Sequence, residues 1–204
     1  MVKSIAIVGG SSDIAKSTIS SMSDDNYKFH VLVRDDSHTD ELSALGVSVV
    51  LGDATSEEDI KNFISGVKEL GEIHAILHCV GSFAVRPPHA MNKEAFETVI
   101  STNLTSAFLT LSIAGKAMLS QGHGRMVFMS SVAGSLGLVN HEAISAAKGG
   151  IESMVRSAAA TYANRGLRIN AVAPGLTDTK LASPIMSNET ASQAASQKIP
   201  IKRV

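Results

Sequence analysis

Short apolar runs recur along the chain, and longer stretches with apolar residues at helical spacing separate them. Each run has four to eight residues, is rich in Val and Ile, and lacks clean alternation; the runs are Ile5–Val8, Phe29–Val33, Val47–Leu51, Ile73–Val80, Met126–Met129 and Leu167–Val172. Runs of this kind are typical of strands covered on both faces of a parallel sheet. The alternation of strand and helix predicts an α/β fold with a doubly wound, mostly parallel sheet.

Composition narrows the picture to one domain. The 204 residues are 44% apolar, and no repeat, charge block or Pro/Gly-rich linker divides them, so we expect a single domain over residues 1–204. With 18 Lys+Arg against 19 Asp+Glu, the chain lacks the clustered positive charge that binds nucleic acid or anionic membranes. The first apolar run is too short for a signal peptide or a membrane span, which predicts a cytoplasmic protein.

The loop after the first predicted strand is the first candidate site. It runs Val8-Gly9-Gly10-Ser11-Ser12-Asp13-Ile14-Ala15 and opens a helix that ends near Met22. Ligands of doubly wound sheets bind at the carboxyl ends of the strands, and a glycine turn lets the backbone approach a pyrophosphate at a helix N-terminus. Taken alone, this loop is a common pattern.

Further elements follow at fixed distances, and together they resemble the short-chain dehydrogenase/reductase family over the whole chain. The elements are Gly52-Asp53-Ala54-Thr55, His78-Cys79-Val80-Gly81, Thr102-Asn103-Leu104, Ser130-Ser131-Val132-Ala133-Gly134, Ala143 to Lys148, and Asn170 to Thr179. The resemblance implies a Rossmann-like fold and an NAD(P)-dependent oxidoreductase that acts on a small carbonyl compound or alcohol.

The resemblance also implies a set of cofactor-binding residues. They are Gly9, Ser11, Ile14, Arg34, Asp53, Gly81, Lys148 and Thr179. Asp53 matches the residue that contacts the adenine ring, and its alternative role is the N-cap of a helix that begins at Ser56. The family's second loop glycine is Asp13 here, and a carboxylate repels a pyrophosphate unless it turns away to cap the helix. We expect that cap.

The same resemblance places the catalytic groups at Ser131, Lys148 and Asn103. Ser131 matches the serine that binds the substrate carbonyl, although Ser130 is adjacent to it. Lys148 matches the lysine that lowers the pKa of a catalytic tyrosine and holds the nicotinamide ribose, and Asn103 the residue whose carbonyl holds a relay water. Where the tyrosine belongs, thirteen residues after Ser131, stands Ile144.

Isoleucine cannot transfer a proton, which leaves two interpretations. In the first, His141 replaces the phenol, because it lies three residues before Ile144 and seven before Lys148, on one face of a helix that starts early enough. In the second, hydride transfer is absent, and the fold serves as a nucleotide-binding or subunit-interaction module.

The choice of cofactor is predicted from the end of the second strand. An Arg at this point accommodates the 2′-phosphate of NADP, whereas an acidic residue pairs with the 2′-hydroxyl of NAD. Arg34 comes first and favours NADP; Asp35 and Asp36 follow directly and keep NAD open. The seven His form no metal signature, so no metal is predicted. The lone Cys79, inside an apolar run, is expected to be an inert buried thiol.

The remaining expectations concern the C-terminal stretch and the assembly. The stretch 181–198 is rich in Ala, Ser and Gln and is interpreted either as a mobile excursion over the substrate site or as a solvated surface helix. Family members continue past the point where this sequence stops, so the chain is natively short or truncated, with an open sheet edge. The resemblance implies a homodimer or homotetramer that pairs through helices near 92–119 and 142–164.

Overall fold

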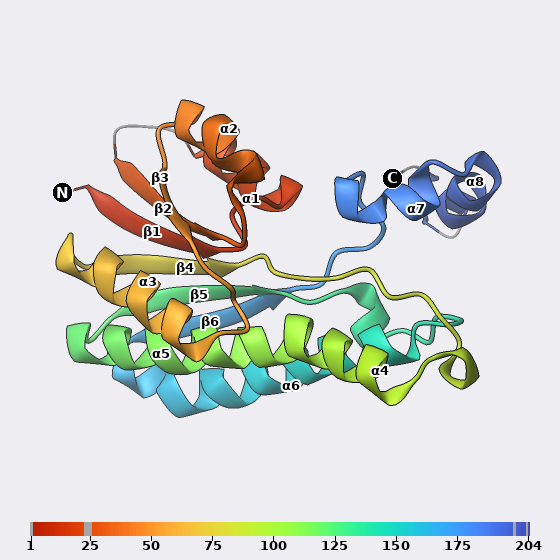
Figure 1. Ribbon diagram of the computed structural model, residues 1–204. Coiled ribbons are helices and arrows are strands. Elements are labelled where there is room, and N and C mark those ends of the chain that lie inside the picture. Colours follow the sequence, from red (N-terminus) through yellow and green to blue (C-terminus); the bar gives the residue numbers. More distant parts are fainter. Residues whose placement is uncertain (1, 23–25, 198, 203) are drawn as a thin grey trace.

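The computed structural model describes residues 2–22, 26–197, 199–202 and 204 as one α/β domain built on a six-stranded sheet (Figure 1). All strands are parallel, in the order β3-β2-β1-β4-β5-β6. They are β1 (Lys3–Val8), β2 (Tyr27–Val33), β3 (Ser48–Leu51), β4 (Ile73–His78), β5 (Gly124–Met129) and β6 (Leu167–Val172). The predicted doubly wound parallel sheet is therefore confirmed, and each predicted run forms a strand.

Helices lie on both sides of this sheet. They are α1 (Asp13–Ser21), α2 (Thr39–Ala44), α3 (Glu57–Glu69), α4 (Lys93–Ile100), α5 (Ser106–Gln121), α6 (Glu142–Tyr162), α7 (Ser183–Met186) and α8 (Glu189–Gln197). Figure 1 shows α1 and α2 above β1 to β3, and α3, α4, α5 and α6 below the sheet. The chain winds outward from β1 to β3 and then returns to add β4 beside β1, so the topological switch point lies between β1 and β4.

The β1 side chains explain why this strand is central. Ile5 and Ile7 pack in the core cluster that contains Ala15 and Ile19 of α1. The alternating residues Ala6 and Val8 pack in a second cluster with α3, α5 and α6. Successive strand residues point to opposite faces, and both faces are apolar, so a central strand is a continuous apolar run.

A π-helical turn, Ser101–Thr105, joins α4 to α5 and widens the helix around Asn103. Such turns insert one residue into the helical repeat and recur at functional sites. The whole stretch Lys93–Gln121 is long and apolar enough to cross a membrane by length and composition alone, and 44% of its most apolar window is buried. In this fold it contributes Ala107, Leu111 and Ala114 to the core below the sheet.

Strand β6 forms one edge of the sheet, and no described residue pairs with its outer side. Its side chains alternate between buried and exposed, and Val172 at its end is 49% exposed. The open edge expected from the sequence is therefore present among the described residues.

The C-terminal stretch folds into two short helices at the carboxyl end of the sheet, on the far side of a connection from β6 (Figure 1). A 3-10 turn, Lys180–Ala182, leads into α7, and α8 follows. The predicted segment 181–198 ends at Lys198, which lies outside the described residues. The described part of the segment is helical and also lines the cavity described below, so both interpretations stay predictions.

Candidate active site

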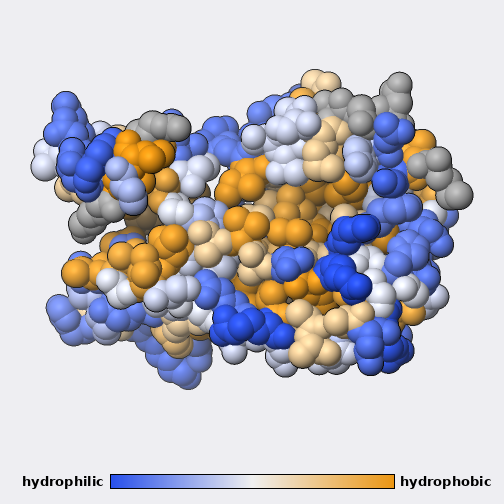
Figure 2. Space-filling model, turned by 180° about the vertical axis from the view of Figure 1, so that it is seen from behind, coloured by the Kyte–Doolittle hydropathy of each residue, from blue (hydrophilic) through white to orange (hydrophobic). Residues whose placement is uncertain are grey.

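A cavity of about 930 Å³ opens at the carboxyl ends of the strands. The loops after β1, β4, β5 and β6 form its floor, the first turns of α6 form one wall, and α7, α8 and Pro200 form the opposite wall. Seen from behind, the molecule is notched on the side of the C-terminal helices, and apolar surface lines that notch (Figure 2). The cavity lies where doubly wound sheets bind their ligands.

The glycine turn after β1 is packed too closely for side chains. Gly9 has a φ of +87°, and a Cβ there would lie 2.9 Å from the backbone nitrogen of Val80. A Cβ on Gly10 would lie 2.5 Å from the Cβ of Val31. Two glycines are therefore required to bring the loop between β2 and β4. Two predicted cofactor residues that follow, Ser11 and Ile14, line the cavity.

The expected capping role of Asp13 is wrong. Ser12 is the N-cap of α1, and its hydroxyl accepts a hydrogen bond from the Ala15 N–H at 3.1 Å. The Asp13 carboxylate instead accepts a hydrogen bond from the backbone N–H of Lys180 at 2.6 Å. Asp13 thus binds a segment that only the fold brings near, and not the N–H groups of its own helix.

The alternative helix-cap role of Asp53 is also wrong. Ser56 caps α3 by accepting from the Asp59 N–H at 3.2 Å. Asp53 accepts from the backbone N–H and the hydroxyl of Thr55, each at 2.8 Å, and its own N–H donates to Asp59 at 2.7 Å. Asp53 does not belong to the lining of the cavity.

Arg34, the predicted 2′-phosphate residue, extends into solvent at the end of β2. Its side chain is 81% exposed and lies 4.0 Å from the carboxylate of Asp35. Asp35 accepts hydrogen bonds from the side chain and backbone of Ser37, which lower the pKa of the Asp35 carboxyl. His38, a residue that sequence reasoning missed, is the nearest residue of this region to line the cavity.

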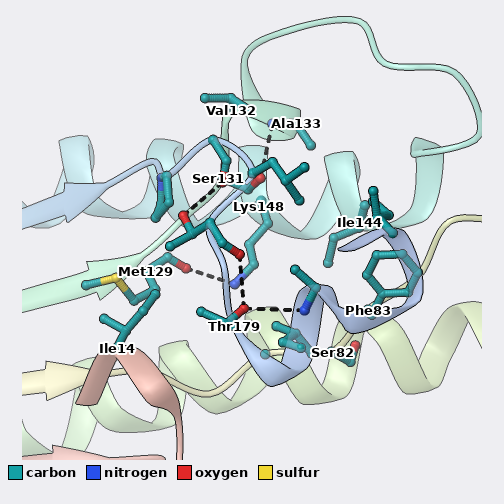
Figure 3. A pocket seen from close by; sticks show the side chains of 18 of the residues that line it. Ile14, Ser82, Phe83, Met129, Ser131, Val132, Ala133, Ile144, Lys148 and Thr179 are labelled. Carbon is teal, nitrogen blue, oxygen red and sulfur yellow. Dashed lines mark hydrogen bonds between the residues drawn. The ribbon is translucent and has the colours of Figure 1, made fainter. Parts of the chain in front are cut away.

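The structure separates the two adjacent serines after β5. Ser130 is 5% exposed and donates toward α6, with its hydroxyl 3.1 Å from the Lys148 carbonyl and 2.8 Å from Glu152. Ser131 accepts from the Ala133 N–H at 3.2 Å, which leaves its hydroxyl proton free to point into the cavity that it lines (Figure 3). Ser131 is therefore the serine available to a ligand.

Glu152, which sequence reasoning also missed, ties the Ser131 loop to α6. It accepts from Ser130 and, at 2.7 Å, from the Ser135 hydroxyl. These two hydrogen bonds, with Ser135 first, lower the pKa of the Glu152 carboxyl. A Cβ on Gly134 would lie 2.9 Å from the Gly149 nitrogen, so the loop and the helix are in backbone contact. No local sequence signal marks this anchor, because its partners lie 17 to 22 residues away.

Lys148 extends from α6 into the cavity beside Ser131 (Figure 3). It is 7% exposed, and its Nζ donates to the Met129 carbonyl at 2.8 Å. Burial lowers the pKa of the Lys148 amine to about 8, and a smaller effect of Cys79 raises it. Burial raises the pKa of the Cys79 thiol to about 11, so Cys79 stays protonated near neutral pH, as expected of an inert thiol.

Asn103 and Lys148 meet at Gly81. A Cβ on Gly81 would lie 3.3 Å from Asn103 Oδ1 and 3.5 Å from Lys148 Nζ. Asn103 is fully buried; its amide donates to Ser82 Oγ at 2.8 Å and to the Val99 carbonyl at 2.9 Å, and it accepts from the Ser82 N–H. The Asn103 side chain holds the loop after β4 through its hydrogen bonds to Ser82. Because Gly81 has no side chain, the space between the Asn103 amide and the Lys148 amine stays unfilled.

Ile144 and His141 occupy the first turn of α6. Ile144 is 7% exposed, packs in a cluster with Val99 and Ala133, and lines the cavity a single helical turn before Lys148 (Figure 3). His141 is the N-cap residue, lines the same cavity, and holds its Nδ1 2.7 Å from the Val139 carbonyl. The structure thus places Ile144 and His141 in the lining of one cavity.

Thr179 lines the cavity and begins the C-terminal turn. Its hydroxyl donates to the Thr177 carbonyl and accepts from the Ala182 N–H, each at 3.3 Å. Of the predicted site residues, those that line this one cavity are Ser11, Ile14, Gly81, Ser131, His141, Lys148 and Thr179. Within the described residues of the chain, no group of three or more His, Cys, Asp or Glu could hold a metal ion.

This fold and cavity define the class of doubly wound α/β proteins whose ligands bind at the switch point of the sheet. The sequence model described as Enoyl-(Acyl carrier protein) reductase matches residues 9–204. The 3-oxoacyl-(acyl-carrier-protein) reductase MabA of Mycobacterium bovis is 31% identical over 203 residues, which are 99% of this chain and 79% of MabA. The chain belongs to the short-chain dehydrogenase/reductase family.

Two further relatives span most of the chain. The 2-(S)-hydroxypropyl-CoM dehydrogenase 3 of Xanthobacter autotrophicus is 28% identical over 203 residues, 96% of this chain and 80% of that protein. Levodione reductase superposes with a TM-score of 0.90 at 26% identity, over 98% of this chain and 84% of its own. The names of these relatives describe oxidoreductases.

Proposed function

We propose that this protein is an NADP-preferring oxidoreductase that interconverts a carbonyl compound and its alcohol. One observation carries the proposal: the Ser131 hydroxyl and the Lys148 amine line one cavity at the N-terminus of α1. A hydroxyl and an amine beside a dinucleotide cradle are the groups that polarise a carbonyl and transfer a proton. Family membership and the names of the relatives support this reaction class.

The residues present fit a dinucleotide. Side chains on Gly9 and Gly81 would fill space that the backbone and the Asn103 and Lys148 side chains now border. Ser11, Ser12 and Ile14 form the start of α1, whose N–H groups favour a pyrophosphate. When bound, the cofactor would supply or accept the hydride. Lys148 would hold the nicotinamide ribose, and Thr179 would close over it from the C-terminal side.

Arg34 supports NADP over NAD. Its guanidinium is exposed at the end of β2 and is held only loosely, at 4.0 Å, by Asp35, so it is free to pair with a 2′-phosphate. Asp35 is engaged by Ser37, which makes it a poorer partner for a 2′-hydroxyl.

The substrate we propose is a small carbonyl compound with an uncharged, apolar substituent. Ser131 donates a hydrogen bond to its oxygen, and the surrounding wall excludes water. That wall is apolar and consists of Phe83, Val85, Val132, Leu136, Leu138, Val139, Ile144, Leu181 and Ile185. A charged substituent would lose its hydration against these apolar side chains, whereas each buried CH₂ contributes about 0.8 kcal/mol.

Ile144 supports a second candidate, a lapsed enzyme that keeps the fold as a nucleotide-binding or subunit-interaction module. The side chain packs in an apolar cluster with Ala143 and Ala147, which suits isoleucine at this position of the fold. Loss of a general acid typically costs 10²–10⁴-fold in rate.

Cofactor titration and a screen of carbonyl substrates distinguish the two candidates. NADPH and NADH are titrated by calorimetry, and turnover is measured on wild type, His141→Ala and Ile144→Tyr. Turnover by the wild type supports the oxidoreductase. An inert wild type that gains turnover in Ile144→Tyr identifies a lapsed active site, and one that binds cofactor but stays inert in both variants favours the module. Absence of binding at millimolar NADPH and NADH contradicts the oxidoreductase and favours the subunit-interaction module.

For assembly, we propose a homodimer or homotetramer in which α4, α5 and α6 pair with a second copy. Phe96 on α4 and Phe108 on α5 are 40% and 55% exposed, and small exposed residues of α6 leave room for a neighbour. Two other small residues of α6 pack against this same chain and not against a second copy. Gly149 contacts Gly134, and Gly150 contacts Leu104. Sedimentation at micromolar concentration tests this, and a clean monomer contradicts it.

A further inference from the structure

The cavity lacks the phenol of its family, and a replacement proton donor must lie within reach of the oxygen that Ser131 binds. The titratable groups that line the cavity are Asp13, His38, Cys79, His141, Lys148 and Lys180. Asp13 accepts the Lys180 N–H, and His38 lies 3.2 Å from Glu41, so these belong to the contacts around α1 and α2. Cys79, His141 and Lys148 remain as candidates for the donor. Cys79 holds its proton too tightly, because burial raises the pKa of this thiol to about 11. The choice is between Lys148 and His141.

Lys148 is a buried residue of α6 whose side chain lines the cavity. It lies one helical turn after Ile144, so the two side chains share one face of α6. Both side chains line the same cavity, and isoleucine is shorter than tyrosine. Nζ is anchored by a single hydrogen bond to the Met129 carbonyl at 2.8 Å, and an ammonium has three donors. Two N–H donors therefore stay available to the cofactor ribose and the substrate.

His141 is less suited. It sits at the N-cap of α6, half-buried at the rim, and its Nδ1 is 2.7 Å from the Val139 carbonyl. The Val139 side chain itself is 84% exposed, so this contact lies at the mouth of the cavity. Lys148, at 7% exposure, lies at the floor, near the loop that carries Ser131.

We propose that the ammonium of Lys148 replaces the missing phenol and donates its proton directly to the substrate oxygen, so that Lys148 is the general acid of carbonyl reduction and the general base of alcohol oxidation. This inference rests on the proposed function.

The step balances with the nicotinamide cofactor as reductant. The carbonyl carbon gains a hydride from the reduced cofactor, and the C=O π electron pair moves to oxygen. That oxygen takes one proton from the Lys148 ammonium. One C–H and one O–H bond form, and three bonds break: the C=O π bond, the N–H bond of the ammonium and the C–H bond of the reductant that carried the hydride. The neutral amine then regains a proton from solvent through the cavity mouth, and the cofactor leaves oxidised.

The surroundings of Lys148 tune it for this exchange. Burial is the first cause that lowers its pKa to about 8, near the working pH that favours proton transfer in both directions. Cys79 and His78 face it from the end of β4, and burial followed by the charge of Lys148 lowers the pKa of His78 to about 3, so that neither bears a charge near neutral pH. Glu152, on the same helix, is turned toward Ser130 and Ser135.

Replacement by arginine separates proton transfer from binding. Lys148→Arg keeps the positive charge and hydrogen-bond donors but cannot release a proton in this pH range. We expect NADPH affinity within about threefold of wild type and a loss of about 10²–10⁴-fold in kcat at saturating cofactor. Lys148→Met, which loses the positive charge and the hydrogen-bond donors, should weaken cofactor binding as well as lower kcat. Lys116→Arg, on the exposed face of α5, is the matched control and should leave both values unchanged.

The pH dependence gives an independent readout. Reduction by wild type should fall about tenfold per pH unit above the pKa of Lys148, and oxidation should rise to a plateau there. In NMR of the free protein, the Lys148 ε-methylene signal should titrate near pH 8.

The outcomes distinguish a failure of the role assigned to Lys148 from a failure of the proposed oxidoreductase function. Turnover that persists in Lys148→Arg with an unchanged pH profile, or that disappears in His141→Ala alone, overturns the role of Lys148 and leaves the oxidoreductase intact. A Lys148 signal that titrates above pH 10 overturns it as well. A wild type without turnover on any carbonyl overturns the proposed function and, with it, this assignment.

Discussion

The Asp13 carboxylate accepts a hydrogen bond from the backbone N–H of Lys180 at 2.6 Å, across 167 residues of sequence. It ties the first turn of α1 to the turn that leads into α7. Lys16, one turn along α1, lies 3.9 Å from the same carboxylate and also binds Glu41 of α2. The contact therefore joins the proposed pyrophosphate cradle to the wall of the substrate cavity.

Removal of this carboxylate should release the C-terminal turn. In Asp13→Ala the Lys180 N–H loses its acceptor, and a hydrogen bond of about 1 kcal/mol corresponds to roughly fivefold faster amide exchange. Hydrogen–deuterium exchange at Lys180, resolved by NMR, measures this. Asp40→Ala, an exposed first-turn acid of α2, is the control. Unchanged exchange at Lys180 in Asp13→Ala would show that other contacts hold the turn.

Arg34 should select between the two cofactors. Arg34→Ala removes the guanidinium proposed to meet the 2′-phosphate, and charge-assisted hydrogen bonds of about 1.5–3 kcal/mol predict roughly 10- to 100-fold weaker NADPH binding. NADH, which lacks the phosphate, should bind as before. Calorimetric titration of both cofactors is the measurement, with Arg125→Ala, an exposed side chain at the start of β5, as the control. Equal weakening of NADPH and NADH would exclude this role.

His78 should make the fold sensitive to acid. Its Nε2–H donates to Ser106 at 3.1 Å, because the single Ser106 hydroxyl proton goes to the Thr102 carbonyl. Nδ1 is buried and has no hydrogen-bond partner among the described residues. Burial, and then the charge of Lys148, lowers the pKa of His78 to about 3 from an ordinary value of 6.5.

The sign follows from proton linkage. Below pH 6.5 the unfolded chain binds a proton at His78, whereas the folded chain does not. The neutral, buried His78 therefore contributes its full share of stability above pH 6.5, and this share is lost as pH falls toward 3. His78→Asn should lower the slope of unfolding free energy against pH in this window by up to about 1.4 kcal/mol per unit. Urea unfolding at several pH values measures it. His89→Asn, at an exposed position, is the matched control, and an unaltered slope in His78→Asn would contradict the assignment.

Glu152 should hold the Ser131 loop. Glu152→Ala removes the acceptor of both Ser130 and Ser135, which we expect to cost about 1–3 kcal/mol in unfolding free energy. Because these hydrogen bonds lower the pKa of Glu152, the stabilisation is present above the ordinary carboxyl range and lost as pH falls through the folded-state pKa. Urea unfolding at pH 7 measures the unfolding free energy of Glu152→Ala and of a control, Glu69→Ala, at the exposed end of α3. Equal stabilities of the two variants would rule the anchor out.

Much of the fold could be predicted from the sequence, because strand identity is a local property. Six apolar runs suffice for a parallel sheet, since only strands covered on both faces lack a polar side. The positions of Ser131, Ile144 and Lys148 likewise fall within one strand-loop-helix unit. The resemblance to the family therefore sufficed to predict that the serine and the lysine share one site, and the structure places both in one cavity.

The tertiary structure decided which side chains meet. Ser130 and Ser131 are equivalent in sequence, and only the packing of α6 against the loop turns one toward Glu152 and the other into the cavity. Asp13 was expected to cap its own helix, but Ser12 holds that position, and Lys180 offers a donor that no local pattern predicts. The physical reason is range: hydrophobic periodicity acts within a few residues, whereas hydrogen-bond partners and burial depend on segments that the crossovers of the sheet bring together.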